Sequence, residues 1–410
     1  MAEWSDNFTL SPVDGGVTAA SGFAASAVSA GLKACGILDV ALVASELGPV
    51  PAAALFTTNS VAAAPVIVSR RHAADGTARA VVINAGNANA CTGAQGIVDA
   101  ESTAAAVADL LGGQAADVVV SSTGVIGVPL PVERLLSALP GVVASLSSTG
   151  GAAAARAIMT TDTVAKEWAV EGDIGARKFV VGGMAKGSGM IAPNMATMLS
   201  VLTTDAPLTG AACDVALRKA VGATFNRVTV DTDTSTNDMV VLMASGAAGG
   251  APIGPDSPDF AQVAAAVRAV CEALARMIAR DGEGATKLIT IDVRGAASDA
   301  DAEVAAFAIA GSPLVKTAVF GRDANWGRVA MAIGKSGCAL DPDAFDITFA
   351  GIEVCRAGAG LRFDEEAALD ALSASDVTIE VDLRLGGGEA RVWTCDLTYD
   401  YVRINGEYRS

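Results

Sequence analysis

The sequence predicts a layered α/β protein. Just over half of the 410 residues (51%) are hydrophobic but only 4% are aromatic, so the interior is built mainly from small and medium aliphatic side chains. Such side chains suit close contacts between helices and sheets. Short apolar runs typical of buried strands also alternate with segments that carry apolar residues at helical spacing. The length allows two or three domains of about 100–200 residues each.

The first half of the chain begins this alternation. The uncharged run 47–68 contains three prolines and predicts strand–turn–strand rather than a membrane span. Further strands are expected at 37–43, 80–84, 116–122 and 178–183, and helices at 97–111, 131–139 and 151–159.

The second half opens with a strand at 227–230 and a helix over 260–278, for which Ser257 can serve as cap. Beyond it we expect helices at 301–310 and 326–334, and strands at 287–293, 315–321, 347–350, 377–385 and 391–404. A glycine-rich break at 280–284 precedes the restart of the alternation. We therefore expect a core domain over 1–285 and a smaller α/β domain over 286–410.

Charge and cysteine usage limit the partners. With 28 basic and 45 acidic residues the net charge is -17, which disfavours binding to nucleic acid or to anionic membranes, although it could simply confer solubility. The seven cysteines are scattered and form no C-x-x-C pair, which argues against a disulfide framework and a thiolate zinc site. The acidic N-terminus lacks the pattern of a signal peptide. We expect a cytoplasmic protein.

The only histidine, His72, precedes a polar turn and is expected on an exposed loop. A Ser-His-Asp or Cys-His mechanism would then be excluded, and so would a metal site with several histidines. Nucleophilic catalysis would need another base.

Thr197, in the segment 191–199, is a candidate nucleophile that needs no histidine. If the chain is cut between Ala196 and Thr197, the new α-amine can act as the base, because such amines titrate at about 7.7–8.0. From the residues alone, an ordinary buried residue on a strand is the favoured interpretation of Thr197.

The segment 186–199 resembles the self-processing site of the ornithine acetyltransferase family, also called glutamate N-acetyltransferases. The resemblance continues in order along the chain. The other matching segments are 25–41, 84–93, 122–127, 158–163, 233–238, 280–287, 321–328 and 401–410.

This resemblance implies a layered αββα core, DmpA/ornithine-acetyltransferase-like, with a smaller C-terminal α/β domain. It implies cleavage into an α chain (1–196) and a β chain (from 197), associated as α2β2. Thr197 would take the acetyl group of N2-acetyl-L-ornithine and pass it to L-glutamate in a ping-pong reaction of arginine biosynthesis. No metal or organic cofactor is implied.

The resemblance also implies roles for individual residues. Thr123 and Gly124 match the oxyanion pair of the family, although by themselves they could form a plain turn. The implied substrate-binding residues are Lys186, Thr197, Glu283, Asn405 and Ser410, together with Thr160 or Thr161, between which spacing does not decide. By itself Glu283 could also be a surface residue at a helix end.

Two other functions remain open. An N-terminal-nucleophile amidohydrolase or aminopeptidase would share the cleavage but pass the acyl group to water. A non-catalytic α/β binding protein would keep its chain uncut. The sequence also leaves open whether acetyl-CoA serves as a second acetyl donor.

Overall fold

The computed structural model describes residues 8–33, 36–192 and 198–407. The chain forms two compact units. The larger unit holds the residues up to Asn226 together with Thr234–Leu274, and the smaller unit holds Arg227–Asp233 and the residues from Ala275 onward. The smaller unit therefore includes a short segment from the middle of the chain. The predicted division at residue 285 stays a prediction.

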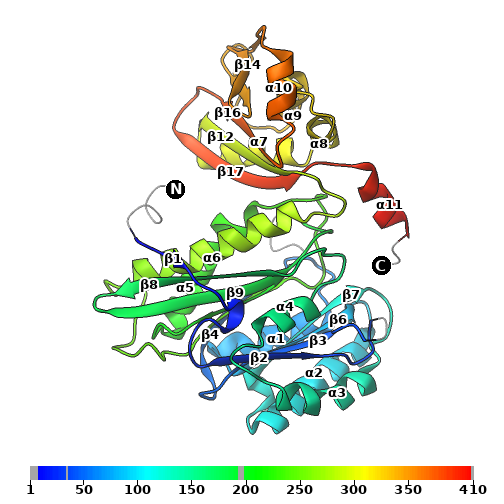
Figure 1. Cartoon of the computed structure of the whole chain (residues 1–410), viewed down its shortest axis with the longest axis vertical. Coiled ribbons are helices and arrows are strands. Elements are labelled where there is room, and N and C mark those ends of the chain that lie inside the picture. Colours follow the sequence, from blue (N-terminus) through cyan, green and yellow to red (C-terminus); the bar gives the residue numbers. More distant parts are fainter. Residues whose placement is uncertain (1–7, 34–35, 193–197, 408–410) are drawn as a thin grey trace. The chain divides into compact units, whose positions relative to one another are not determined.

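Two sheets form the larger unit (Figure 1). The seven-stranded sheet has the order β1-β8-β9-β10-β11-β4-β5, and its strands are β1 (Ser11–Pro12), β8 (Lys166–Ile174), β9 (Arg177–Lys186), β10 (Leu199–Thr204), β11 (Met239–Ala244), β4 (Val50–Phe56) and β5 (Thr77–Ala78). The four-stranded sheet has the order β2-β3-β6-β7, with β2 (Phe23–Val28), β3 (Val40–Ser45), β6 (Ala80–Asn87) and β7 (Val118–Val125).

Alternating side chains on the strands explain the layers. In β3, Ala41 and Val43 belong to the core cluster that also contains Val201 and Val241 of the other sheet. The intervening residue Leu42 belongs to the cluster formed with the outer helices. Because successive side chains on a strand point to opposite faces, each sheet is apolar on both sides.

Helices cover the two outer faces (Figure 1). The four-stranded sheet packs on α1 (Ala64–His72), α2 (Gly93–Leu111) and α3 (Val132–Ala144), and the seven-stranded sheet packs on α5 (Gly210–Ala223) and α6 (Phe260–Arg280). The short helix α4 (Gly151–Ala157) contributes alanines to the core between the sheets. The expected αββα core is confirmed.

The smaller unit is a six-stranded sheet with helices. Its strand order is β15-β14-β13-β16-β12-β17, with β15 (Ala359–Gly360), β14 (Ile352–Arg356), β13 (Asp346–Phe349), β16 (Asp376–Asp382), β12 (Leu288–Ala296) and β17 (Gly388–Cys395). Its helices are α7 (Asp299–Ala310), α8 (Pro313–Phe320), α9 (Trp326–Gly334), α10 (Glu365–Ala371) and α11 (Tyr399–Glu407).

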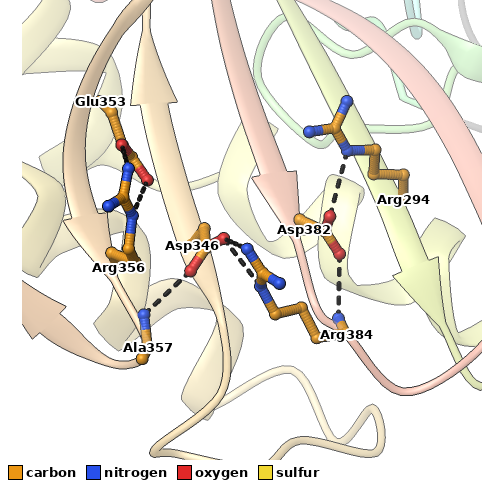
Figure 2. Close-up of polar contacts among 7 residues, drawn as sticks. All are labelled: Arg294, Asp346, Glu353, Arg356, Ala357, Asp382 and Arg384. Carbon is orange, nitrogen blue, oxygen red and sulfur yellow. Dashed lines mark hydrogen bonds and ion pairs between the residues drawn. The ribbon is translucent and has the colours of Figure 1, made fainter.

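Charged side chains link neighbouring strands of this sheet, as Figure 2 shows. Asp346 of β13 accepts hydrogen bonds from Arg384 Nε (2.7 Å) and from the N–H of Ala357 (2.9 Å). Arg294 of β12 pairs with Asp382 of β16 at 3.3 Å. Exposed pairs of this kind each contribute about 0–1 kcal/mol, so they support the strand register more than the stability of the unit.

Most of the predicted helices and strands are confirmed, but the strand expected at 315–321 is wrong, because this segment lies in α8. Ser312 caps the helix by accepting the N–H of Val315, and Pro313 occupies its first turn. Val315 and Val319 then fall on one buried helical face.

Three further expectations are corrected. The strand expected at 391–404 ends at Cys395, and α11 follows it. The run 47–68 is a strand followed by the start of α1, rather than two strands. The segment 227–230 makes only an isolated bridge, between Val228 and Trp393. Within the described ranges no single helix is long and apolar enough to cross a membrane, and one bent pair, α7 with α8, meets the criteria of length and composition.

Candidate active site

Thr123 and Gly124, the predicted oxyanion pair, lie near the end of strand β7, which finishes at Val125. Gly124 has φ +130°, and a Cβ atom there would lie 2.4 Å from the carbonyl carbon of Gly86 and 2.6 Å from the nitrogen of Asn87. No other residue type fits this close approach of two backbones. The pairing of β6 with β7 is irregular at the same point, so that Thr123 is opposite both Ala85 and Asn87. An irregularity of this kind changes the direction in which the backbone and side-chain groups near the end of a strand point.

Buried amide side chains hold this strand end. Asn84 accepts a hydrogen bond from Ser122 Oγ (2.6 Å) and donates to the carbonyl of Asn87 (2.9 Å). Asn237 donates to the carbonyls of Ser122 (2.8 Å) and Ala88 (2.7 Å). These bonds give buried backbone carbonyls at the strand end a side-chain partner, and buried backbone groups are costly when unpaired.

Lys186 is the last residue of β9, and its side chain is buried beside Thr123. Its Nζ donates to Thr123 Oγ1 at 3.3 Å. In the antiparallel pairing of β9 with β10, Lys186 is opposite Leu199. The chain therefore re-enters the sheet beside Lys186, two residues after Thr197.

Asp162 connects Lys186 to the predicted substrate-binding threonines. Its carboxylate accepts hydrogen bonds from Lys166 Nζ (2.7 Å), from the N–H of Gly187 (2.7 Å) and from the N–H of Thr160 (3.0 Å). Burial alone would raise the pKa of Asp162, but the ammonium groups of Lys186 and Lys166 and the bond from Gly187 outweigh burial and lower the pKa to about 2. Asp162 is therefore an anion that fixes the Thr160–Thr161 turn beside the end of β9.

Lys33 adds a third cation to this region. Its Nζ donates to the carbonyls of Ala157 (2.8 Å) and Leu38 (3.1 Å). The buried carboxylate of Asp39 accepts three backbone N–H groups of the same loop, the nearest two at 2.6 Å. Burial lowers the pKa of Lys33 to about 8, with Asp39 opposing this shift and Lys186 adding to it. The Lys33 ammonium therefore loses its proton more readily than an exposed lysine does.

Thr197 and Ala196 lie outside the described residues, as does Ser410. The next residue along the chain, Met198, is held at both of its backbone groups. Its N–H donates to Asp238 Oδ1 at 2.8 Å, and its carbonyl accepts the N–H of Met239 at 3.1 Å.

The smaller unit brings together two other predicted residues, Glu283 and Asn405. Asn405 Nδ2 of α11 donates to Glu283 Oε2 at 2.7 Å. Gly284 has φ +70°, and a Cβ there would lie 2.6 Å from the nitrogen of Tyr401, so glycine is required where α11 packs on this turn. Burial, together with the carboxylates of Asp231 and Glu283, raises the pKa of Tyr401 well above its usual range.

The structure thus places Thr123, Gly124 and Lys186 together in the larger unit, with Thr160 and Thr161 joined to them through Asp162. Thr160 and Thr161 are both half-buried, and the geometry does not select one of them. Among the residues that the structure describes, no group of three or more His, Cys, Asp or Glu side chains could hold a metal ion.

His72 was expected on an exposed loop, and that expectation is wrong. It ends α1, and its Nδ1 lies 2.8 Å from the carbonyl of Val118 at the start of β7. Five residues of strand, about 16 Å, separate Val118 from Thr123. The conclusion that another base is needed therefore does not depend on the exposure of His72.

Several residues of this region had no predicted role, namely Lys33, Asp162, Asn237 and Asp238. The segments 158–163 and 233–238 are rich in polar residues, but the spacing of those residues does not indicate which side chain faces the strand ends. Asn237 illustrates the difficulty, because its two acceptors are more than a hundred residues away in the sequence.

Known proteins resemble this chain over most of its length. The model of the ArgJ family matches residues 24–410. The arginine biosynthesis bifunctional protein ArgJ of Symbiobacterium thermophilum is 52% identical over 398 residues, which cover 97% of this chain and 99% of that protein. A crystal structure of the arginine biosynthesis bifunctional protein ArgJ of Bacillus halodurans is 51% identical and covers 52% of this chain and 100% of its own, with a TM-score of 0.51. The ornithine acetyltransferase of Mycobacterium tuberculosis, complexed with ornithine, is 44% identical, covers 46% of this chain and 100% of its own, and has a TM-score of 0.42.

Proposed function

The chain belongs to the ArgJ family, and from this premise we propose that it is a glutamate N-acetyltransferase of arginine biosynthesis. It moves the acetyl group of N2-acetyl-L-ornithine to L-glutamate through an acetyl ester of Thr197. The observation that carries the proposal is the meeting of two strand ends. Lys186 at the end of β9 contacts Thr123 at the end of β7, and β10 begins opposite Lys186, two residues after Thr197.

The proposed reaction has two halves. Thr197 Oγ attacks the acetyl carbonyl carbon while the α-amine of Thr197 takes the hydroxyl proton. The amide C–N bond then breaks, the α-ammonium returns the proton to the leaving nitrogen, and ornithine departs. In the second half the amine of glutamate attacks the ester carbonyl carbon, and the C–O bond to Thr197 breaks. The proton lost by the attacking amine passes through the α-amine to the threonine oxygen, so that acetylglutamate forms and the Thr197 hydroxyl is restored. An α-amine suits this work because it titrates near neutral pH.

Thr123 and Gly124 are the proposed oxyanion donors, through the threonine hydroxyl and the glycine N–H. One such donor contributes about 3 kcal/mol to the transition state. The proximity of the Lys186 ammonium favours negative charge at this point, because Coulomb attraction strengthens where water is excluded. In the larger unit, we assign substrate binding to Lys186 and to the turn at Thr160 and Thr161. Glu283, Asn405 and Ser410 are proposed as further substrate-binding residues, with Glu283 suited to an ammonium group.

The mechanism requires cleavage between Ala196 and Thr197. The matched crystal structure from Bacillus halodurans supports it, because the whole of that chain corresponds to 52% of this one. The proposed β chain, residues 197–410, is also 52% of the 410 residues. We further propose a cytoplasmic α2β2 assembly, a smaller domain over 286–410, and no metal or organic cofactor.

The test follows acetyl transfer directly. Purified protein is incubated with acetylornithine and glutamate, and acetylglutamate, ornithine and acetate are measured together. Equal amounts of acetylglutamate and ornithine are expected. Acetate without acetylglutamate would instead identify an amidohydrolase or aminopeptidase. A second arm replaces acetylornithine with acetyl-CoA and decides whether that donor is used.

A further inference from the structure

Two adjacent residues, Asn237 and Asp238, form hydrogen bonds with the residues next to Thr197 and Thr123 in the sequence. Asp238 Oδ1 accepts the N–H of Met198 at 2.8 Å, and Met198 is joined by one peptide bond to Thr197. Asn237 Nδ2 donates to the carbonyl of Ser122 at 2.8 Å, and Ser122 is joined by one peptide bond to Thr123. The two side chains are buried, with 1% of Asp238 and 6% of Asn237 exposed.

No strand ladder sets the spacing between these two ends. Strand β10 belongs to the seven-stranded sheet and β7 to the four-stranded sheet, so their backbones do not pair. Apolar side chains fill the space between the sheets, and apolar packing is not directional. Hydrogen bonds do fix direction and distance. Those of Asn237 cross from the segment before β11, a strand of the seven-stranded sheet, to Ser122 of β7, and that of Asp238 ties Met198 to the same segment.

The segment that carries the two residues is itself firmly held. Thr57 N–H donates to the carbonyl of Asp238 (3.0 Å), and Thr57 Oγ1 donates to the carbonyl of Ser235 (2.7 Å). Thr236 Oγ1 donates to Asn237 Oδ1 (2.6 Å), which orients the amide so that its NH2 group faces β7. A rigid support of this kind is what a precisely spaced site requires.

We propose that Asn237 and Asp238 are positioning residues that hold Met198, which follows the proposed nucleophile in the chain, at a set distance from Ser122, which precedes the oxyanion donors Thr123 and Gly124. The assignment rests on the proposed function for the identity of the nucleophile. Both chain cleavage and acetyl transfer need the hydroxyl and the oxyanion donors in register, so both should depend on this pair. Substrate binding should depend on it little, since neither residue belongs to the proposed substrate-binding set.

The experiment compares Asn237→Ala, Asp238→Ala and Asp238→Asn with the control Asn59→Ala. Asn59 Nδ2 donates to the carbonyl of Thr234 in the same segment, at 2.9 Å, but has no part in the contacts with Met198 and Ser122. For each variant we measure the rate of cleavage by denaturing electrophoresis, and kcat and KM per cleaved chain. Folding is checked by thermal unfolding.

The alanine variants at 237 and 238 should slow cleavage and lower kcat by about 100-fold with KM within about 3-fold, the loss expected for a displacement of about 1 Å. Asp238→Asn keeps an oxygen that can accept the Met198 N–H, so it should stay within about 10-fold of the unmodified enzyme. Asn59→Ala should leave kcat unchanged. The inference is overturned if Asn237→Ala and Asp238→Ala lower kcat no more than Asn59→Ala does.

Two further outcomes distinguish a failure of the positioning proposal from misfolding of a variant and from a failure of the proposed function. If Asp238→Ala does not fold, Asn237→Ala and Asp238→Asn test the proposal instead. If Asp238→Asn then loses as much kcat as Asn237→Ala does, positioning by the hydrogen bond of Asp238 is contradicted. If the unmodified protein releases only acetate, the proposed function fails. The cleavage rates still test the positioning, because they need no substrate.

Discussion

At the residue scale, the proposed chemistry depends first on the hydroxyl group of residue 197. We expect Thr197→Ala to abolish both chain cleavage and acetyl transfer, because the variant lacks the hydroxyl that attacks in both reactions. Thr197→Ser keeps a hydroxyl and should still be cleaved. Denaturing electrophoresis, N-terminal sequencing and the transfer assay measure these outcomes. A Thr197→Ala protein that is cleaved and active would refute the assignment.

Gly124 is constrained by space as well as by φ, and this predicts a specific difference from its neighbour Gly127. In Gly124→Ala the new Cβ would lie 2.4 Å from the backbone of Gly86, so β6 and β7 must separate where the oxyanion donors lie. We expect kcat to fall at least about 100-fold. Gly127 has φ +79° but no atom within 4 Å of its Cβ position, so Gly127→Ala should cost about 1–2 kcal/mol of stability and leave kcat within about 3-fold. Equal losses of kcat in the two variants would contradict this reasoning.

The buried pair of Asp162 and Lys166 predicts a pH-dependent contribution to stability. Asp162→Asn removes the carboxylate beside a lysine whose side chain is 0% exposed, and we expect a loss of about 3 kcal/mol in urea unfolding at pH 7. The folded-state pKa of Asp162, about 2, is below its ordinary value of 3.8, so its contribution is complete above about pH 5 and is lost as pH falls toward 2. The difference between the two proteins should therefore be constant from pH 7 to 5 and shrink below pH 4. Asp214→Asn, which breaks the exposed pair with Arg218, is the control and should cost less than about 1 kcal/mol.

At the element scale, helix α8 shows how a capping residue decides between strand and helix. Ser312 is buried and accepts the N–H of Val315, the third residue of the helix. We expect Ser312→Ala to cost about 1 kcal/mol, within the range of about 0.5–2 kcal/mol for lost caps. Ser373→Ala is the control, because that exposed hydroxyl donates to the carbonyl of Leu369 one turn earlier and caps no helix start. Chemical unfolding followed by circular dichroism compares the two, and equal costs would mean that the cap is unimportant.

The same helix marks the limit of prediction from sequence. Strong periodicity identified α2, α6 and α9, because their apolar residues repeat at helical spacing over two turns or more. In 315–321 the apolar residues fit either period, and only the contacts of Ser312 and the burial of Val315 and Val319 settle the outcome. Helix α11 has no fully buried residue, so it lacks the apolar core-facing stripe by which a helix is identified from sequence.

The residues of the candidate site also divide into those that the sequence identifies and those that it does not. Thr123, Gly124 and Lys186 were identified through the resemblance of long motifs, and the structure brings them together. The roles of Asp162 and Asn237 could not be predicted, because each depends on partners that only the folded chain brings near. Buried polar groups of this kind are determined by tertiary geometry and leave no periodic pattern in the sequence.

At the scale of the whole molecule, the position of the proposed cleavage site explains how two chains can remain one protein. Strands β10 and β11 follow residue 197 but lie in the middle of the seven-stranded sheet. They are flanked by β9 on one side and β4 on the other, which both precede the cut. Cleavage after Ala196 removes a connection between β9 and β10 and leaves their ladder of hydrogen bonds in place.

We therefore expect the two chains to separate only when the fold is lost. A tag at the C-terminus of the β chain should retrieve the α chain in equal amount, even after washing in 1 M salt. The shared interface contains a sheet ladder and an apolar core, which salt screening does not weaken. Denaturant should release the α chain from the same resin. The quantities of the two chains are read by denaturing electrophoresis, with uncleaved Thr197→Ala as a marker of the joined chain. Recovery of the tagged chain alone from cleaved, folded protein would contradict a sheet shared between the chains.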